Sequence, residues 1–304
     1  MSVMRSPEVD LVYGVKRVCL AWDQPRSTYY ARIAPAKTRP ADFVAKKRGP
    51  KTAVSDDELL TSIKETIEAS PFKGEGYRKV WVNLKFGPKR LRVGANRVLR
   101  IMRQEDLLSP YRHRKADPNL HDRTIITDVP NKMWGTDGTQ VTTIDDGNIW
   151  IFSAIEHWNA ECIGIYVCKA GTRFNAVQPV LEGVQSIFGS VNRGVAQGLR
   201  LRLDHGSANC SEHFQNEIRR LGIEPSFSFV QEPQTNGVVE RFNRTLKEQA
   251  IYGKVFKNVD EVRQAVLEFR NNYNRFWRLG KLGFMTPLEA RGRYQEQRPL
   301  SAAA

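Results

Sequence analysis

The chain has 304 residues, of which 40% are apolar, so it is long enough for two or three modest domains with buried cores. Lys and Arg number 47 against 33 Asp and Glu, a formal net charge of +14. No apolar run approaches the roughly 20 residues of a membrane span, and the N-terminus lacks the apolar stretch of a signal peptide. We therefore expect a cytoplasmic protein that uses no membrane.

The positive charge is concentrated in the first part of the chain. Residues 1–130 hold 26 basic and 15 acidic side chains, whereas residues 131–304 hold 21 and 18. A basic surface favours a polyanion through counterion release. A ribosomal or membrane-surface protein would share this property, so charge alone gives nucleic-acid binding only a modest lead.

Four cysteines, Cys19, Cys162, Cys168 and Cys210, show no C-x-x-C spacing. The pattern therefore argues against a disulfide framework and against a zinc knuckle. We expect these side chains to be buried or half-buried.

In chain order, residues 1–33 are predicted to form a small helical unit and residues 34–54 a basic linker rich in Pro, Lys and Arg. Residues 55–109 are predicted to form a second helical domain. Ser55 to Glu58 fits a capping box, and apolar residues then recur at helical spacing in three segments. These apolar positions are Leu59, Leu60, Ile63, Ile67, Tyr77, Val80, Trp81, Leu84, Val98, Ile101 and Met102.

This second domain is interpreted as helix-turn-helix-like, with a break between its second and third helices at Gly87-Pro88. Its third helix and the preceding turn carry Lys89, Arg90, Arg92, Arg97, Arg100 and Arg103. Such a face is typical of DNA binding, although an ordinary solvated helix surface would also be basic. The connector 110–130, with a basic cluster at 112–115, is either a spacer or a segment that follows a phosphate backbone.

From residue 131 the pattern changes to an α/β core that we expect to extend to 295, followed by a tail at 296–304. Strands are predicted over 134–144, 148–155 and 162–167 as an antiparallel meander with a tight turn at Asp146-Gly147. A helix over 174–188, a strand over 199–203, a helix over 211–221 and a strand over 226–230 follow. Helices are predicted over 235–250 and after Lys257. The fold class is thus α/β, with a mixed five-stranded sheet and helices.

Three acidic residues carry the chemistry of this core. Asp137 lies in the first predicted strand, Asp204 ends the fourth, and Glu240 lies on the helix that follows, with 35 residues between the last two acids. Three converging carboxylates repel one another and call for a divalent cation. A lone Asp or Glu is usually a surface charge, so only the joint placement supports a site.

Other candidates near these acids have simpler interpretations. Asp145 and Asp146 lie in the hairpin turn, where Asp is expected for backbone reasons. Glu156 and Glu161 flank the next turn and are predicted to be surface residues. His205 could orient a metal-bound water or contact phosphate, but a histidine in this position more often packs or caps, so it is not assigned to catalysis.

On the helix over 235–250, residues spaced by i, i+3, i+4 and i+7 share one face. These residues are Glu240, Asn243, Arg244 and Lys247, whereas Val239, Phe242 and Leu246 lie on another face. Lys247 lies two turns, roughly 10 Å, beyond the glutamate. Asn236 is predicted to help cap this helix.

Several sequence segments resemble one known family. The segments are LDHGS at 203–207, QTNGVVERFNRTLKE at 234–248 and LGFMTPLEA at 282–290, with weaker similarity at 26–30 and 76–80. They resemble DDE transposases and retroviral-type integrases, and more closely the second-reading-frame proteins of the insertion-sequence-three family. The similarity covers most of the chain.

The resemblance implies a ribonuclease-H-like core that cleaves and joins DNA at the ends of a bacterial insertion sequence. In this family Asp137, Asp204 and Glu240 would hold Mg2+, with Mn2+ as a substitute, and the attack on phosphodiesters would be by water and then by a 3′ hydroxyl. Lys247 and Arg244 would contact the element end, although an Arg244 pair with Glu248 is nearly as well supported.

The implied partners are DNA, as terminal inverted repeats and target, and further copies of the chain. An upstream-frame protein, fused or separate, is a further implied partner, and the implied location is the bacterial nucleoid. The family commonly carries Asp on the second strand where this chain has Glu156.

Two alternatives remain from the sequence. A non-catalytic DNA-binding repressor derived from a transposase would need the basic first part but not the acids. A ribonuclease-H-like nuclease would cleave without joining strands.

Overall fold

The structure is a computed structural model that describes residues 3–38, 53–108, 127–227 and 236–297. The chain divides into two compact units, residues 1–53 and 54–304. The first unit contains α1 (Gly14–Ala21) and α2 (Arg26–Thr38), so its second helix extends beyond residue 33, where the helical unit was expected to end. Among its described side chains only Cys19 is buried, which leaves this unit without a core of its own.

Helices α3 (Asp56–Glu68), α4 (Tyr77–Phe86) and α5 (Ala95–Gln104) form a small bundle. The expected capping box is confirmed, since the Glu58 amide donates to Ser55 Oγ and the Ser55 amide donates to the Glu58 carboxylate. α4 ends at Gly87, where a Cβ would lie 2.3 Å from the carbonyl oxygen of Asn83. The buried residues of the bundle are Leu59, Ile63, Val80, Leu84, Val98, Ile101 and Met102, as the helical spacing predicts.

A five-stranded mixed sheet forms the centre of the second unit, in the order β3-β2-β1-β4-β5. The strands are β1 (Met133–Thr143), β2 (Gly147–Glu156), β3 (Cys162–Cys168), β4 (Arg200–Leu203) and β5 (Glu224–Phe227). β1, β2 and β3 pair antiparallel, as expected for the meander, while β4 pairs parallel to β1 and to β5. The predicted α/β fold class with five strands is confirmed.

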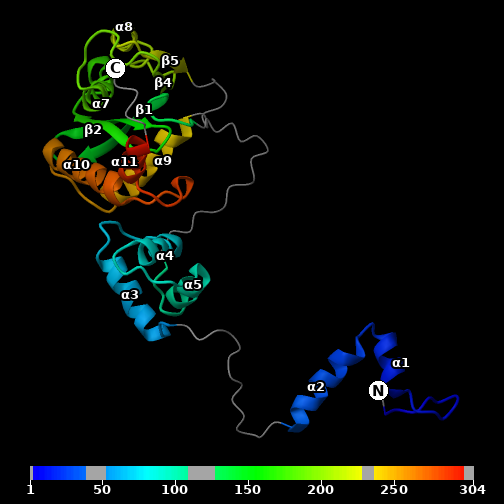
Figure 1. Ribbon diagram of the computed structural model, residues 1–304. Helices are drawn as coiled ribbons and strands as arrows, with labels where there is room; N and C mark the ends of the chain where they lie inside the picture. Colours follow the sequence, from blue (N-terminus) through cyan, green and yellow to red (C-terminus); the bar gives the residue numbers. More distant parts are fainter. Residues whose placement is uncertain (1–2, 39–52, 109–126, 228–235, 298–304) are drawn as a thin grey trace. The chain divides into compact units, whose positions relative to one another are not determined.

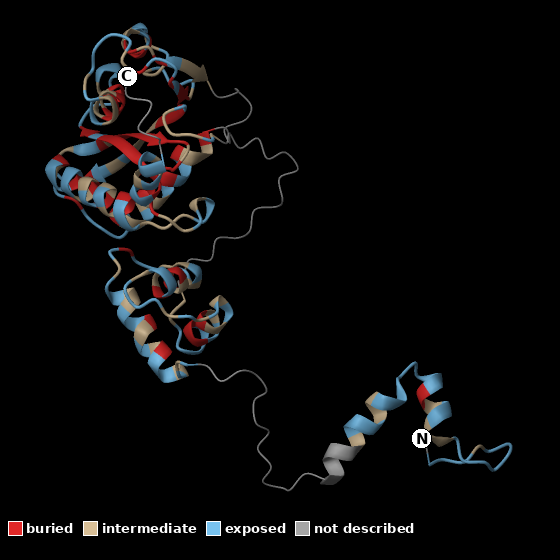
Figure 2. Ribbon diagram, viewed as in Figure 1, coloured by how far each residue is buried: buried red, intermediate tan, exposed pale blue. Residues whose placement is uncertain are grey.

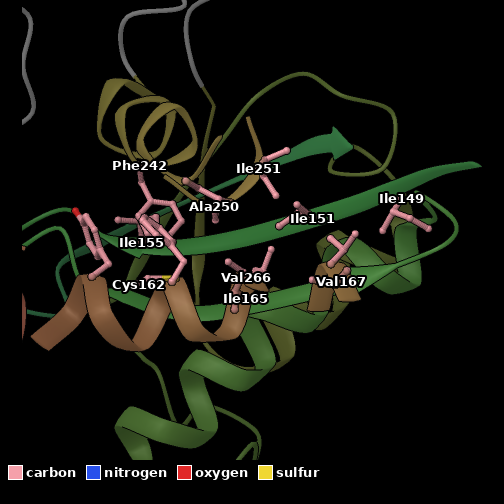
Figure 3. Packing of buried hydrophobic residues seen from close by; sticks show 14 of the residues in the cluster. Ile149, Ile151, Ile155, Cys162, Ile165, Val167, Phe242, Ala250, Ile251 and Val266 are labelled. Carbon is pink, nitrogen blue, oxygen red and sulfur yellow. The ribbon is translucent and has the colours of Figure 1, made fainter. Parts of the chain in front are cut away.

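Helices cover both faces of this sheet (Figure 1). They are α6 (Arg173–Ala176), α7 (Gln178–Phe188), α8 (Glu212–Arg220), α9 (Gly237–Leu246), α10 (Val259–Phe276) and α11 (Pro287–Gln297), with a π-helix η2 (Lys247–Ile251) and a 3-10 turn η3 (Gly280–Leu282). Because side chains alternate along a strand, β2 sends Ile149, Ile151 and Ile155 toward α9 and α10 (Figure 3). Phe152 and Ala154 pack on the other face with residues of α7 and α8. The central strands are accordingly buried (Figure 2).

Two predicted helices differ in detail from those observed. The helix expected over 174–188 is two helices, because the chain turns at Val177 and Pro179 cannot donate a backbone hydrogen bond to the preceding turn. The helix expected over 235–250 is α9 followed by η2, whose wider turn is marked by the Tyr252 amide donating to the Lys247 carbonyl at 2.7 Å. The expected strand over 226–230 is observed to Phe227, and its last residues lie outside the described ones.

The prediction that Glu156 and Glu161 are surface residues is wrong, because both are buried. The Glu156 carboxylate accepts hydrogen bonds from the amides of Asn131 and Trp158 and from Trp134 Nε1. Burial raises the pKa of Glu156, and these hydrogen bonds oppose that shift. Glu161 forms an ion pair with Arg291 of α11. Residues far apart in the sequence supply these partners, so local spacing could not reveal them.

All four cysteines are free, and Cys19, Cys162 and Cys168 are buried whereas Cys210 is exposed. No helix in the described part of the chain has both the length and the apolar character needed to cross a bilayer.

Candidate active site

The sheet itself brings the first two acids together. β1 and β4 run parallel, with Gly135 opposite Arg202. Two residues further along each strand this register sets Asp137 beside Asp204, just past the end of β4. Asp137 lies on the face that packs against α9, since Val141, four residues on and therefore on the same face, joins that cluster.

Asn243 connects α9, the helix that carries Glu240, to Asp137. Its Nδ2 donates to Asp137 Oδ2 at 2.9 Å, and its Oδ1 accepts from Ser153 Oγ at 3.1 Å. Ser153 is the cross-strand partner of Asp137. Asn243 is buried and lies one helical turn beyond Glu240, so this contact turns the Glu240 side of α9 toward Asp137.

Asp204 is held by its own loop. Its Oδ1 accepts from the Gly206 amide at 2.9 Å and from Asn209 Nδ2 at 2.6 Å. His205 stacks on Phe227, with ring centroids 5.3 Å apart. The packing expected for His205 is therefore observed, and the polar contacts of Asp204 fix one of its two oxygens.

Glu240 lies in the first turn of α9 and is exposed. Val239, Phe242 and Leu246 of the same helix are buried, as the predicted division of faces requires. The prediction that Asn236 caps this helix is wrong, because its side chain makes no capping bond and donates instead to the Thr136 carbonyl at 3.3 Å. Asn236 thereby joins the start of α9 to β1 directly beside Asp137.

The electrostatics of the site are those of an acid cluster. Burial is the main cause that raises the pKa of Asp137, and the negative charges of Asp204 and Glu240 raise it further. The hydrogen bonds from Gly138 and Asn243 oppose this shift. Within the described residues none of the three acids forms an ion pair with a basic side chain.

The donor set fits a divalent cation in kind, since carboxylate oxygens are what such ions prefer. In the described ranges no three acidic, His or Cys side chains lie close enough together to hold an ion as they stand.

The predicted DNA-binding residues of the second helical domain fall into two groups. Arg97 and Arg100 both pair with Asp56 at 2.6 Å, and Lys89 pairs with Glu65. Helix α3 therefore supplies carboxylate partners to these three cations. The remaining residues, Arg90, Arg92 and Arg103, are exposed.

Arg244 of α9 is exposed, and Lys247, the first residue of η2, is half-buried. Lys247 keeps ordinary helical backbone angles, φ −61° and ψ −46°, and the π-helical turn widens only after it. Its position two turns beyond Glu240 is thus preserved.

Sequence reasoning placed Asn243 on the right face without giving it a contact, and it did not single out Asn209. Each donates to a carboxylate of the triad. The usable signal was the i, i+3 spacing of Asn243 from Glu240. No comparable local signal marks Asn209.

Two family models and several curated proteins match this chain. A family model described as an integrase core domain matches residues 221–287, and one described as an HTH-like domain matches residues 55–115. Two curated Escherichia coli relatives, transposase InsD for insertion element IS2A/D/F/H/I/K and transposase InsD for insertion element IS2D, are each 27% identical over 243 residues. Each of these matches covers 77% of this chain and 78% of the relative.

Among solved structures, similarity extends to a simian T-cell lymphotropic virus intasome in complex with PP2A regulatory subunit B56 gamma. That match has 16% identity and a TM-score of 0.42, and it covers 74% of this chain and 70% of the other. The HTLV-2 integrase catalytic core domain in complex with magnesium matches at 17% identity and a TM-score of 0.41, over 53% of this chain and 97% of the other.

The family matches and the transposase relatives indicate a DDE polynucleotidyl transferase with an integrase-type catalytic core. The chain is a transposase with an HTH-like domain before that core, and the insertion-sequence-three family fits it.

Proposed function

We propose that this transposase cleaves and joins DNA at the ends of an insertion sequence, with Asp137, Asp204 and Glu240 as its catalytic acids. The observation that carries the assignment is the register of β1 and β4, which sets Asp137 beside Asp204, together with the Asn243 contact that turns α9 toward them. An element end is the substrate that the names of the InsD relatives support.

The three carboxylates are proposed to hold Mg2+, with Mn2+ as a substitute. Asp137 and Asp204 would jointly hold the metal ions, and Glu240 would complete the donor set. When bound, two such ions activate the attacking oxygen and stabilise the leaving oxygen at phosphorus.

The protein's own groups have distinct parts in this proposal. Asn243 holds Asp137 Oδ2, so that Oδ1, which already accepts from the Gly138 amide, keeps a fixed direction. The Gly206 amide and Asn209 fix Asp204 Oδ1 and leave Oδ2 available as a ligand. Glu240 is exposed on a helix that is anchored through its opposite face, so it can approach without unfolding α9.

DNA positioning is proposed for Arg244 and Lys247, which lie on the Glu240 side of α9, and for the exposed Arg90, Arg92 and Arg103. Arg97, Arg100 and Lys89 would contact phosphate only by exchanging their carboxylate partners. The Arg100 and Lys89 pairs are exposed, and such pairs contribute at most about 1 kcal/mol, so the exchange is energetically accessible for these two residues. Arg97 is half-buried and also donates to the Val54 carbonyl, so its contact with α3 is mainly structural.

The active species is proposed to be a multimer acting on two element ends and target DNA, with the upstream-frame protein fused or separate. A positive strand-transfer result would exclude the two rival functions, a non-catalytic repressor and a nuclease that does not join strands.

The experiment is a strand-transfer assay on labelled element ends with Mg2+ or Mn2+, with and without the upstream-frame protein. The triad substitutions Asp137→Asn, Asp204→Asn and Glu240→Gln should each abolish cleavage and joining while DNA binding remains, because each removes one charge at nearly constant shape. Asp145→Asn, at an exposed position of the hairpin turn, is the matched control and should stay active. Full activity in a triad variant would remove that residue from the site.

A further inference from the structure

Three buried polar side chains lie behind the catalytic acids with atoms that lack partners. They are His157, Arg202 and Asn236, with exposed fractions of 4%, 6% and 5%. Within the described part of the chain, His157 Nδ1 and Nε2, Arg202 Nε and Asn236 Oδ1 are buried without a hydrogen bond. Each such atom costs roughly 1–3 kcal/mol, so several in one place require an explanation.

The three side chains surround Gly135 of β1. A Cβ on residue 135 would lie 2.9 Å from His157 Nε2 and 2.9 Å from Asn236 Oδ1. Arg202 is the register partner of Gly135 on β4, and paired residues of parallel strands project to the same face. The four residues therefore share the α9 face of the sheet, one step from Asp137 and Asp204.

The donors and acceptors of this group are complementary. Asn236 uses its amide nitrogen on the Thr136 carbonyl, which leaves its Oδ1 as an acceptor toward His157. A neutral imidazole has one donor and one acceptor, so Nε2–H serves Asn236 and Nδ1 must accept. The unpartnered N–H of Arg202 Nε is the remaining donor, and its Nη1 already donates to Ser226 Oγ at 2.9 Å.

The charge state of His157 agrees with this matching. Burial is the main cause that lowers the pKa of His157, and the positive charges of Lys281 and Arg202 lower it further, to about 4. The Lys281 ammonium donates to the His157 carbonyl at 2.8 Å. The imidazole is therefore neutral at pH 7.

We propose that Arg202, His157 and Asn236 form a polar relay, closed directly or through one ordered water, that holds the three acid-bearing elements in register. Arg202 lies two residues before Asp204, and Asn236 precedes the helix of Glu240 while holding the carbonyl next to Asp137. His157 is then a positioning residue for the catalytic acids that touches neither DNA nor metal. Gly135 is required because any side chain there would occupy the space between His157 and Asn236.

This inference rests on the proposed function only for its consequence in catalysis, so the first test is spectroscopic. Long-range 15N–1H correlation of the histidine rings in the full chain reports each tautomer, and His157→Gln assigns the His157 signals. At pH 7 the expected result is a neutral ring protonated at Nε2, with Nδ1 accepting a hydrogen bond. A ring protonated at Nδ1, or at both nitrogens, would overturn the relay whether or not the chain transposes DNA.

The second test is a double-mutant cycle in single-turnover strand transfer with Mg2+. His157→Ala and Asn236→Ala should each lower the rate about 10-fold or more, because small positioning errors reduce rates strongly, while binding of end DNA stays within about twofold. Residues in one network are not additive, so the double variant should be no slower than the slower single variant.

His213→Ala, which removes an imidazole of α8 that contacts the Phe174 ring, is the matched control and should keep the wild-type rate. His157→Gln should recover part of the loss because its amide supplies one donor and one acceptor, and it replaces the alanine variant in the cycle if that variant does not fold. Multiplicative losses in the double variant, or a wild-type rate for both His157 variants, would refute the relay. Absence of strand transfer by the wild-type chain would instead refute the proposed function and leave the spectroscopic test standing.

Discussion

Replacing Asn243 with leucine should show how much the hydrogen bond that positions Asp137 contributes to stability and activity, because the three acids themselves are left in place. Leucine has nearly the shape of asparagine but makes neither of its two hydrogen bonds, to Asp137 Oδ2 at 2.9 Å and from Ser153 Oγ at 3.1 Å. A bond to a charged group is worth about 1.5–3 kcal/mol and a neutral one about 0.5–1.5. The free energy of unfolding should therefore fall by about 2–4 kcal/mol.

The same change should lower the rate of strand transfer about 100-fold, since Asp137 loses the contact that fixes its orientation. Ser153→Ala is the informative comparison, because it removes only the neutral bond. It should cost about 1 kcal/mol of stability and change the rate little. Asn192→Ala, at an exposed position, is the control for substitution as such.

The assays are urea unfolding of the isolated protein and single-turnover strand transfer at saturating Mg2+. A normal rate in Asn243→Leu would show that the bond to Asp137 has no part in positioning it. An equal loss of rate in Ser153→Ala would show that general loosening of the sheet, and not the bond to the acid, controls activity.

Four further outcomes are expected. Because the pKa of Asp137 is raised in the folded state, the metal-free protein loses stability as pH rises from the ordinary carboxyl range through the raised pKa. Asp137→Asn removes this loss, so it should raise the melting temperature more at pH 7 than at pH 4. An equal effect at both pH values would contradict this. Lys247→Ala should lower the rate of end processing about 100-fold with unchanged metal binding, and Lys247→Arg should retain part of the activity. Normal end processing by the alanine variant would show that Lys247 is only a surface charge. In filter binding, Arg103→Gln should lower the salt slope of DNA binding by about one unit. In thermal unfolding, Arg97→Gln should mainly destabilise the α3–α5 bundle, because it breaks the contact with α3. The reverse pattern would contradict the assignment of Arg103 to DNA and of Arg97 to the bundle. Gly164→Ala should destabilise the core by at least 1–3 kcal/mol in urea unfolding, because its Cβ would lie 1.9 Å from a backbone oxygen of α7, and unchanged stability would show that α7 can move aside.

The sequence by itself determined most helices and strands of this protein and the sequence segments around its three candidate acids. The capping box at Ser55, the hairpin turn at Asp146 and the apolar face of α9 are local features, encoded in residues a few positions apart, so spacing was sufficient to predict them. The frames around Asp204 and Glu240 fixed the class of chemistry because their residue types and separation are both readable in one dimension.

Only the tertiary structure decided which polar groups meet. Glu156 and Glu161 read as surface acids, yet both are buried because Trp134, Asn131 and Arg291 supply donors from distant positions. Arg97 and Arg100 were predicted to belong to a DNA-binding face, but both pair with Asp56 of α3.

The same holds around the acids, where Asn243 reaches Asp137 across 106 positions and Asn236 reaches the Thr136 carbonyl across 100. Hydrophobic spacing states which face of a helix is buried but not which strand it packs against or in what register. Partners of buried polar groups depend on that register, so they became known only once the sheet order and the placement of α9 were known.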